Sequence, residues 1–392
     1  MTHQIDTTVM AQAMEQIVEQ GFGGLNNAVA ILLNEAMKVE RSRVLQAGPW
    51  QRTEERQGYA NGYKPKKVDT RLGKLSLQIP QVRGEIEFYP SALDRGLRSE
   101  RALKLAMAEM YVKGVSTRKV TDILEKLCGL EVTSTQVSRA AALLDEEIAK
   151  WRNRPPNSFP FLQLDATYEK IRCDGSVVSC AVLIATGIND EGKRTVLGVN
   201  VSLSEAEVHW RQFLSSLKRR GLHGVKMITS DDHQGIKAAL KSTFNGVPWN
   251  RCHVHLQRNA NQYVPKMHMR SAVAQDIRTI FNAPDQEEAE RLLEKTVTKY
   301  KKSASRLAAW MEENLPEGFT VFGLPVHQRR RLRSTNMLER INKEIKRRTK
   351  VATLFPNESS LLRLVSAILM EISDEWETGK RYLKMDTAET FN

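Results

Sequence analysis

The sequence predicts a protein of the α/β class, with a mixed sheet at its centre and helical regions both before the sheet and inserted into it. Three observations predict this class. Residues 161–201 contain three strand-like segments, and a helix, a strand and a second helix follow them up to residue 244. Residues 269–315 show only helical periodicity. The first 150 residues are also mostly helical in pattern.

The 392-residue chain is strongly basic, with 59 lysine and arginine residues against 46 acidic ones and a net charge of +13. A chain of this length can bury several hydrophobic cores, so several domains are expected. Its charge favours a phosphate-rich polymer or an anionic membrane as partner. The longest apolar runs, such as residues 180–185, are far shorter than the ~20 residues of a membrane span. A nucleic acid is therefore the expected partner, and a membrane is not.

The expected location of the protein is the reducing cytoplasm. Residues 1–6 lack the basic start and apolar core of a signal peptide. Four cysteines in a chain of this length are too few for a disulfide framework. With DNA as partner, the protein would be associated with the nucleoid.

Residues 1–95 are predicted as two segments. Residues 1–50 form a helical arm, with apolar stripes over residues 9–18 and 25–44 on either side of a glycine-rich break. The arm is either a simple helical pair or an arm that contacts DNA or a second copy of the chain. Residues 51–95 begin with a stretch rich in arginine, lysine, glycine and tyrosine, up to residue 67. That composition suits a segment that follows a phosphate backbone, although a solvated basic loop is the alternative.

Residues 74–80 and 84–89 alternate apolar and polar side chains, so they are predicted to pair as two strands. Residues 96–152 form a helical block with helices over residues 102–113, from residue 116 and from residue 133, the last with a Ser/Thr cap. This order is typical of a helix-turn-helix that binds DNA, but also of helix triplets that never touch DNA. The candidate DNA contacts here are Arg118, Lys119, Gln136 and Arg139.

Residues 153–392 are predicted to hold the sheet. A proline-broken hinge at residues 152–158 precedes strands over residues 162–165, 179–187 and 195–201. Helix 205–220, strand 225–230 and helix 234–244 follow, and this order is that of an RNase H-like nuclease fold. The core would therefore comprise residues 153–258 and 329–392, with an all-helical insertion at residues 259–328. The final helix, residues 358–376, is amphipathic and suits core or dimer packing.

Three carboxylates stand out because separate elements deliver them. The apolar strand 161–164 ends on Asp165, strand 225–230 runs into Asp231 and Asp232, and Glu339 lies in the first turn of a basic helix that opens at Ser334. Carboxylates held together repel one another, and a divalent cation resolves that conflict. Mg²⁺ prefers oxygen ligands, and two such ions ~4 Å apart promote in-line displacement at phosphorus. The prediction is a site for two Mg²⁺ ions, which Mn²⁺ can replace.

Two of these acids have alternatives. Asp232 competes with Asp231, and only one should face the site because neighbours on a strand point oppositely; we choose Asp231. Residues 336–339 have the spacing of a helix capping box, in which Glu339 would satisfy backbone amides. Against this, Asn342, Lys343 and Lys346 share the helix face of Glu339, as a metal and phosphate site requires.

Cys252 and His255 could suggest zinc, but structural zinc needs four ligands and no second cysteine pair lies nearby. We therefore predict that Cys252, His255 and Asn259 are packed, hydrogen-bonded residues that support the site. The basic helix around Glu339 supplies further candidate DNA contacts: Arg340, Lys343, Lys346, Arg347 and Arg348.

Taken together, the motifs resemble those of the mutator-type bacterial insertion-sequence transposases. The matching stretches occur in the family's order: Asn61-Gly-Tyr-Lys-Pro, Tyr111-Val-Lys-Gly-Val-Ser-Thr-Arg, Leu164-Asp165-Ala-Thr-Tyr-Glu-Lys, Val196-Leu-Gly, Ser230-Asp231-Asp-His-Gln-Gly235, Trp249-Asn-Arg-Cys-His-Val-His255, Arg258-Asn259 and Thr335-Asn-Met-Leu-Glu339-Arg-Ile-Asn-Lys-Glu-Ile-Lys-Arg-Arg-Thr. They cover most of the chain between about residues 50 and 380. Asp232 departs from the family, in which the residue after the second aspartate is usually small, and Gln234 stands where the family often has an acid.

The resemblance implies an RNase H-like catalytic domain with a DDE triad of Asp165, Asp231 and Glu339. It further implies a homodimer that acts on the terminal inverted repeats of a mobile element and on target DNA. The implied chemistry is hydrolysis that frees a 3′-OH, followed by attack of that hydroxyl on a second phosphodiester. A silent repeat-binding protein and an RNase H-like nuclease without strand transfer are the rival functions.

Overall fold

The computed structural model describes residues 7–93, 95, 99–350 and 354–385. The chain divides into two compact units, Met1–Leu143 and Leu144–Asn392. Within these residues the structure confirms a mixed α/β protein with a helical N-terminus and strands in both orientations. No helix in the described ranges has both the length and the apolar character needed to cross a bilayer.

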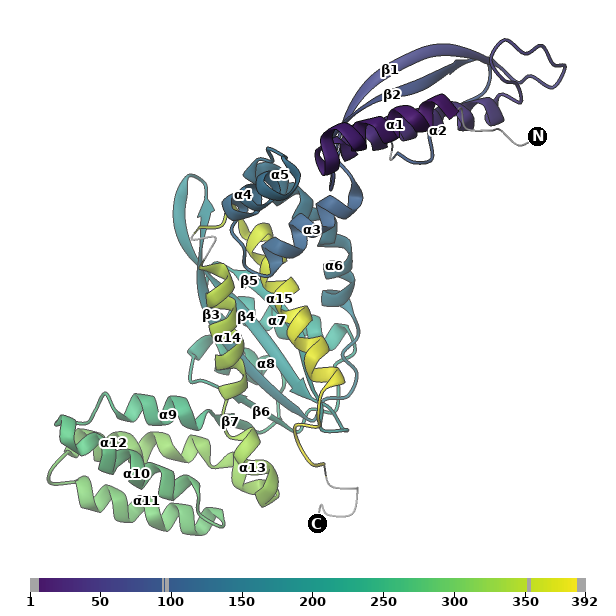
Figure 1. Ribbon diagram of the computed structural model, residues 1–392. Coiled ribbons are helices and arrows are strands. Elements are labelled where there is room, and N and C mark those ends of the chain that lie inside the picture. Colours follow the sequence, from purple (N-terminus) through teal and green to yellow (C-terminus); the bar gives the residue numbers. More distant parts are fainter. Residues whose placement is uncertain (1–6, 94, 96–98, 351–353, 386–392) are drawn as a thin grey trace. The chain divides into compact units, whose positions relative to one another are not determined.

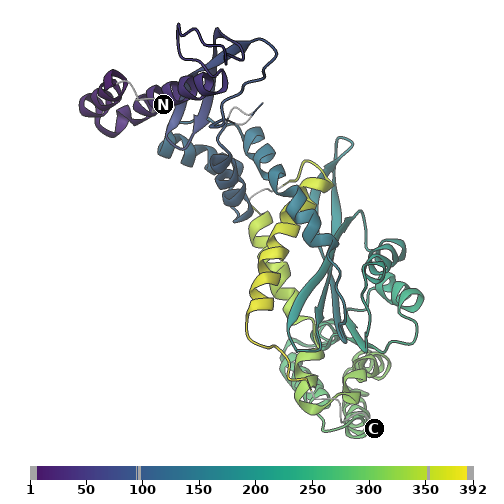
Figure 2. The same ribbon diagram turned by 90° about the vertical axis from the view of Figure 1, so that its right-hand side faces the viewer.

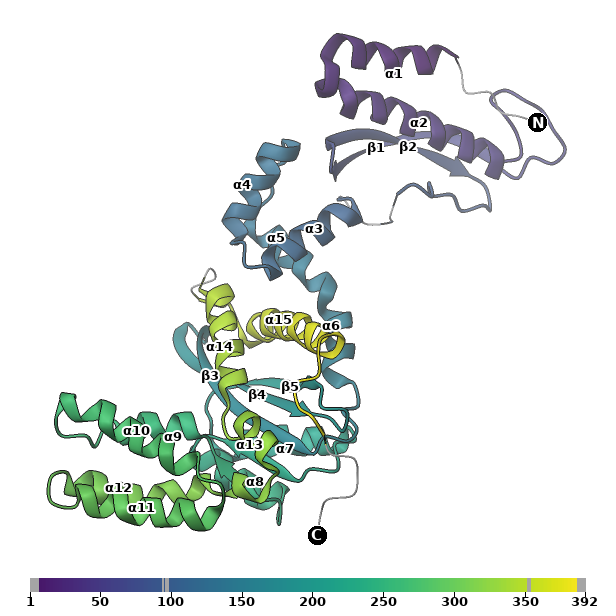
Figure 3. The same ribbon diagram turned by 60° about the horizontal axis from the view of Figure 1, so that its bottom comes forward.

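The first unit begins with helix α1 packed on helix α2, which in turn packs on a two-stranded sheet (Figures 1 and 3). Helices α1 (Thr7–Gln20) and α2 (Leu25–Val44) flank a short 3₁₀ turn at the glycines, as predicted. The sheet consists of β1 (Tyr59–Thr70) and β2 (Gly73–Arg83), paired antiparallel. Met37 of α2 is buried against the inward side chains of β2, which alternate along the strand as Leu75, Leu77 and Ile79.

The sequence predicted the wrong partner for the strand at residues 74–80. Residues 74–80 do form a strand, but they pair with β1, and residues 84–89 form no strand. Strand β1 was not predicted from the sequence, because its first seven residues, from Tyr59, are all exposed. A strand without a buried face lacks the apolar alternation by which strands are recognised.

Three helices complete the first unit, and their ends follow the predicted signals. They are α3 (Arg101–Val112), α4 (Thr117–Cys128) and α5 (Ser134–Ala141). The Ser116 side chain accepts the backbone N–H of Lys119 at the start of α4, and Gly129 ends that helix in the left-handed conformation with φ 61°. Thr133 and Gln136 form a reciprocal capping box on α5.

The second unit has a five-stranded sheet with the order β5-β4-β3-β6-β7. The strands are β3 (Phe161–Cys173), β4 (Ser176–Ile188), β5 (Arg194–Ser202), β6 (Met227–Ser230) and β7 (Trp249–Arg251). The first three form an antiparallel meander, whereas β6 is parallel to β3 and β7 is parallel to β6. The predicted turn between β4 and β5 is confirmed by the N–H of Gly192, which donates to the carbonyl of Asn189 over 2.9 Å.

One strand differs from its prediction in length. The sequence ends the first strand at Asp165, but β3 continues to Cys173 and pairs with β4 along its whole length. Polar residues after Asp165 conceal the continuation, although Thr167 and Ile171 are buried. Asp165 therefore lies inside a strand, so both of its backbone neighbours are held by the sheet.

Helices cover both faces of this sheet, as Figures 2 and 3 show. Helices α7 (Glu207–Arg219) and α8 (Gln234–Thr243) cover one face, where Leu162 and Leu164 of β3 pack against Trp210 and Ile236. Helices α14 (Asn336–Thr349) and α15 (Glu358–Thr378) cover the opposite face, toward which Asp165 points. Helix α6 (Asp145–Asn153) begins the unit and is joined to α15 by an ion pair between Asp145 and Arg363.

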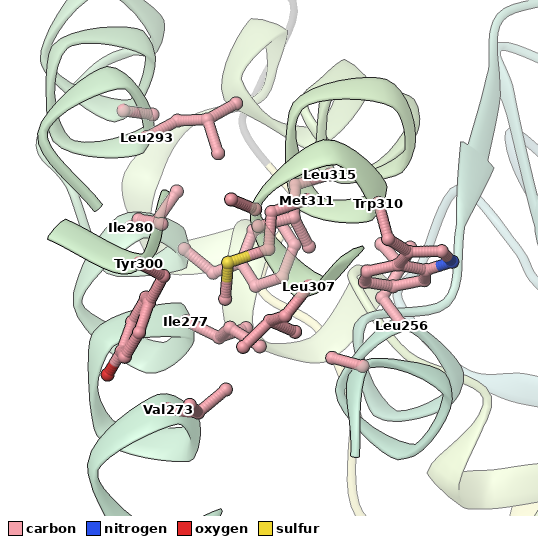
Figure 4. Close-up of a cluster of buried hydrophobic side chains, with 14 of the residues drawn as sticks. Leu256, Val273, Ile277, Ile280, Leu293, Tyr300, Leu307, Trp310, Met311 and Leu315 are labelled. Carbon is pink, nitrogen blue, oxygen red and sulfur yellow. The ribbon is translucent and has the colours of Figure 1, made fainter. Parts of the chain in front are cut away.

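Helices α9 (His253–Ala260), α10 (Arg270–Phe281), α11 (Gln286–Tyr300) and α12 (Ser305–Asn314) share a core of their own (Figure 4). Helices α10, α11 and α12 lie within residues 269–315, where the periodicity predicted helices only. Ile277, Leu307 and Met311 are buried at their centre. Helix α13 (Val326–Leu332) then leads back to the sheet, and the basic helix expected from Ser334 begins at Asn336 as α14.

The four cysteines are free thiols in different surroundings. Cys128 of the first unit and Cys173 of the second are half-buried, whereas Cys180 and Cys252 are buried.

Candidate active site

Strand β3 holds Asp165 against helix α14. The side chain is 7% exposed. The carboxylate accepts the side-chain amide of Asn342 over 2.9 Å and the backbone N–H of Ala166 over 3.0 Å. Burial is the main cause that raises the pKa of Asp165 to about 7, and the negative charge of Asp231 adds to it. A buried carboxylate with amide partners and a second acid beside it is therefore the centre of this site.

Asp231 and Asp232 follow β6 but have different surroundings. The charge of Asp231 acts on Asp165, and its Oδ1 accepts the backbone N–H of His233 over 3.3 Å. Asp232 instead forms ion pairs with Lys237 over 2.8 Å and Arg251 over 3.0 Å. The structure therefore brings Asp231 together with Asp165 and turns Asp232 toward two cations.

The two cations that pair with Asp232 also pair with an acid in the segment after α12. Lys237 and Arg251 each form an ion pair with Glu317, both over 2.8 Å. Glu317 lies in the 3₁₀ turn Leu315–Gly318 that follows α12, and the Arg251 side chain is only 3% exposed. The network joins the segment beside Asp231 to the turn that follows α12.

Glu339 does not cap its helix. Thr335 is the N-cap residue of α14 and makes no side-chain capping bond, so the capping box that the sequence allowed is not formed. The Glu339 carboxylate instead accepts a hydrogen bond from Arg258 of α9 over 2.8 Å. Its Oε1 also lies 3.9 Å from Nε2 of His255.

His255 is the side chain that the three acids share. A hydrogen bond with Cys252 is the main cause that raises the pKa of His255, and the charges of Asp165 and Asp231 raise it further while burial opposes them. Glu339 lies on the same imidazole, 3.9 Å from it. The charges of Asp165 and Asp231 therefore act on the same ring that lies 3.9 Å from Glu339, although 174 residues separate Asp165 from Glu339.

Cys252 joins the starts of α9 and α14. Its sulfur accepts hydrogen bonds from the backbone N–H and the hydroxyl of Thr335, both over 3.3 Å. Burial acts to raise the pKa of the thiol, but the hydrogen bonds with His255 and Thr335 outweigh it, and the net pKa is lowered. Asn259 lies one turn beyond His255 on α9, and its carbonyl accepts the N–H of Gln262 over 3.0 Å.

The family model described as "Transposase, Mutator family" matches residues 1–379 of the chain. The chain belongs to the Mutator family of transposases. This confirms the family that the sequence motifs indicated.

Named relatives of this transposase span nearly its whole length. It is 53% identical over 388 residues to the transposase for insertion sequence element IS406 of Burkholderia multivorans, covering 98% of this chain and 100% of the relative. It is 40% identical to the transposase for ISRM5 of Rhizobium meliloti, covering 95% of this chain and 94% of the relative. The transposase for IS256 in transposon Tn4001 of Staphylococcus aureus is 35% identical, with 98% and 99% covered.

Glu205 is a fourth acid near the site that the sequence analysis of this transposase missed. It lies in the loop before α7, is 8% exposed and comes within 3.8 Å of Nδ1 of His233. Burial is the main cause that raises its pKa, and a hydrogen bond with Tyr168 and the charge of His233 oppose this. An acid two residues before a helix resembles an ordinary helix start, so no pattern along the chain distinguishes Glu205 as a site residue.

Gly235 explains how α8 approaches Glu205. A Cβ atom at this position would lie 2.0 Å from the carbonyl oxygen of Glu205, which no side chain allows. Glycine therefore lets the first turn of α8 pack directly on the loop that carries Glu205. The same close approach positions His233, the N-cap residue of α8, beside the site.

The predicted DNA contacts of α14 fall into two groups. Arg340, Lys343, Lys346 and Arg347 are exposed, and Lys346 lies 3.2 Å from Glu169 of β3. Arg348 is buried instead and forms ion pairs with Glu344 and with Glu371 of α15. Arg348 therefore joins the two helices.

The predicted DNA contacts of the first unit are all exposed. Arg118 and Lys119 lie in the first turn of α4, and Gln136 and Arg139 lie on α5. The Oε1 atom of Gln136 accepts the backbone N–H of Thr133 over 2.7 Å as part of the capping box.

Proposed function

We propose that this chain is a DDE transposase that cuts DNA at the terminal inverted repeats of an insertion sequence and joins the freed ends to new DNA. The observation that carries the proposal is the buried Asp165, which α14 holds through Asn342 and on which the charge of Asp231 acts, while Glu339 of the same helix lies 3.9 Å from His255. Strand β3, the end of β6 and the first turn of α14 each contribute one carboxylate. The sheet order, with three antiparallel strands followed by two parallel ones, supports an RNase H-like fold.

The donor set suits Mg²⁺, or Mn²⁺ in its place. Asp165 is buried beside Asp231, and in the described residues it forms no ion pair with lysine or arginine. Carboxylate oxygens are the ligands that hard divalent ions prefer, and such ions activate an attacking oxygen and stabilise the leaving oxygen at phosphorus. Asp165 and Asp231 would hold the two ions, with Glu339 as the third carboxylate. No group of three metal-binding side chains is already gathered in the described part of the chain, and Glu339 pairs with Arg258 instead.

The residues of the chain prepare this site for phosphodiester chemistry. Asn342 fixes the orientation of the Asp165 carboxylate, and Cys252 fixes the His255 imidazole that faces Glu339. Water attacks a phosphodiester at the element end and leaves a 3′-OH. That hydroxyl then attacks a phosphodiester at the other element end or in target DNA, so one bond forms as another breaks. No covalent bond between protein and DNA is required.

The remaining parts of the chain would hold the DNA. The exposed cations of α14 lie beside the site, and the basic residues of α4 and α5 are exposed in the first unit. We propose that residues 1–152 hold the DNA-binding segments, that residues 259–328 form an insertion into the catalytic core, and that two copies of the chain act together on two element ends. Phosphate contacts of this kind would make binding strongly dependent on salt.

One assay tests the proposal against its rivals. Purified protein is mixed with labelled element ends and Mg²⁺ or Mn²⁺, with Asp165→Asn as control. Cleavage followed by joining, both lost in the variant, is the expected result. Cleavage without joining would indicate an RNase H-like nuclease, and binding without cleavage would indicate a silent repeat-binding protein.

A further inference from the structure

Residues of the loop between α2 and β1, the loop that Figure 3 shows in the first unit, line a pocket of about 690 Å³. Four arginines line it: Arg41, Arg52, Arg56 and Arg83. None of them forms an ion pair with a carboxylate in the described ranges. Two aromatic residues, Trp50 and Tyr59, lie among them. A concave surface of this size is typical of small-molecule and nucleotide sites, and its charge calls for an anion.

Arg41 is the strongest sign that an anion belongs here. It is 8% exposed, lies in the last turn of α2 and lines the pocket. Its contacts are a 3.4 Å hydrogen bond to the hydroxyl of Tyr63 and a position 5.2 Å from the centre of that ring. Neither contact supplies negative charge, and a buried cation without a counter-charge is costly.

Arg56 and Arg83 are held in place around the pocket. Arg56 donates hydrogen bonds to the backbone carbonyls of Gly48, Gln51 and Gly58, which fixes the loop as well as the guanidinium. Both arginines lie against Tyr59, at 5.3 Å and 5.5 Å from its ring centre. Their positions are set before any ligand arrives, which lowers the entropic cost of binding.

Trp50 is fully exposed at the same pocket. Its relative exposure is 101%, and its backbone is left-handed with φ 59°, which is rare for an aromatic residue. An indole left wholly in water next to guanidinium groups suits stacking on a nucleobase. The face of a base inside a duplex is already stacked on its neighbours, so only an unpaired base can take this contact.

We propose that this pocket binds one unpaired nucleotide of a DNA strand, with its phosphate among the arginines and its base on Trp50. This inference rests on the proposed function, because it assumes that DNA is the substrate. Under this proposal, the basic segment after residue 50 binds the end of a DNA strand or a distorted base step, and not a continuous duplex.

Binding of labelled oligonucleotides by full-length Asp165→Asn protein, which cannot cleave them, tests the proposal. Trp50→Ala is expected to weaken binding of single-stranded DNA about ten-fold and to change binding of a blunt duplex less than two-fold. Phe22→Ala is the matched control, because Phe22 is 96% exposed in the same unit and lies outside the pocket. Arg52→Ala should lower the slope of log affinity against log salt by about one, whereas Trp50→Ala should leave it unchanged.

Three results would overturn the proposal. Equal effects of Trp50→Ala and Phe22→Ala on single-stranded DNA binding would exclude stacking of a base on Trp50. An equal loss on single-stranded and duplex DNA would make the pocket an ordinary backbone contact. Competition by a deoxynucleoside monophosphate or inorganic phosphate at the oligonucleotide's own concentration would make it a free-anion site. Cleavage by the wild-type protein is scored separately, so failure here is distinct from failure of the proposed activity.

Discussion

The side-chain amide of Asn342 donates a 2.9 Å hydrogen bond to the carboxylate of Asp165, joining α14 to β3 across 177 residues of sequence. A hydrogen bond to a carboxylate favours its charged form. It therefore opposes the burial that raises the pKa of Asp165. Helix α14 therefore carries Glu339 and, through Asn342, also lowers the pKa that burial raises at Asp165.

Asn342→Ala should raise the pKa of Asp165 further. The carboxylate would then ionise at higher pH, so the pH profile of DNA cleavage should move upward and the rate at pH 7 should fall about 10- to 100-fold. Single-turnover cleavage rates measured across pH check this. Asn336→Ala is the control, because Asn336 is exposed at the start of the same helix. An unchanged profile with a lower rate at every pH would contradict the electrostatic role.

Asp165→Asn should make the protein more stable at alkaline pH. The pKa of Asp165 is about 7 in the folded protein, against about 4 in an unfolded chain. The folded state holds the extra proton between these values, so wild-type stability falls as pH rises from about 4 through about 7. The variant cannot ionise there, and at pH 8 its free energy of unfolding should exceed that of the wild type by about 4 kcal/mol.

Urea unfolding at pH 4 and pH 8 without divalent ions measures that difference. Addition of Mg²⁺ at pH 8 should then stabilise the wild type and leave Asp165→Asn unaffected, because binding to the folded state alone shifts unfolding. Equal stabilisation of both proteins would argue against a metal at Asp165.

Asp231→Asn and Asp232→Asn should have opposite consequences. Asp231→Asn should abolish cleavage with little loss of stability, because its charge repels Asp165 in the protein without metal and the amide oxygen can still accept the N–H of His233. Asp232→Asn should cost ~1–3 kcal/mol, because it leaves the nearly buried Arg251 with fewer counter-charges, yet it should retain slow cleavage. Chemical denaturation and cleavage assays on both variants check this. Loss of cleavage in Asp232→Asn at unchanged stability would reverse the two assignments.

Gly235→Ala should displace the first turn of α8 from Glu205. The added Cβ has no room beside the Glu205 carbonyl, so we expect a loss of about 1–3 kcal/mol in the free energy of unfolding and slower cleavage. Gly323→Ala is the matched control, because a Cβ there meets no atom within 4 Å. Similar thermal stability of the two variants would show that α8 can shift without cost.

The sequence predicted the helices better than the strands. Helices α1, α2 and α15 began and ended within about two residues of their predicted limits, because apolar spacing and punctuating glycines mark them. The continuation of β3 and the whole of β1 were missed, because solvated or polar strand faces carry no alternation. Strand pairing depends on the tertiary fold. The sequence therefore paired residues 74–80 with residues 84–89, whereas in the structure residues 74–80 pair with β1.

The sequence predicted which acids to consider but not their contacts. It singled out Asp165, Asp231 and Glu339 because it placed each at an element end, although Asp165 lies within β3 in the structure. The ion pair of Glu339 with Arg258 and the approach of Glu205 depend on where α9 and α8 pack, and spacing along the chain does not encode that. Asp232 could not be separated from Asp231 for the same reason, since its partners Lys237 and Arg251 come from α8 and β7.

The different burial of the four cysteine thiols allows selective labelling of this protein. Cys128 and Cys173 are the more accessible cysteines, with one in each compact unit, while Cys180 and Cys252 are shielded. Two nitroxide or fluorescent labels could thus be attached to the wild-type sequence without engineering. Spectroscopic distances between them, recorded with and without an oligonucleotide, would test whether DNA binding changes the separation of the two labels.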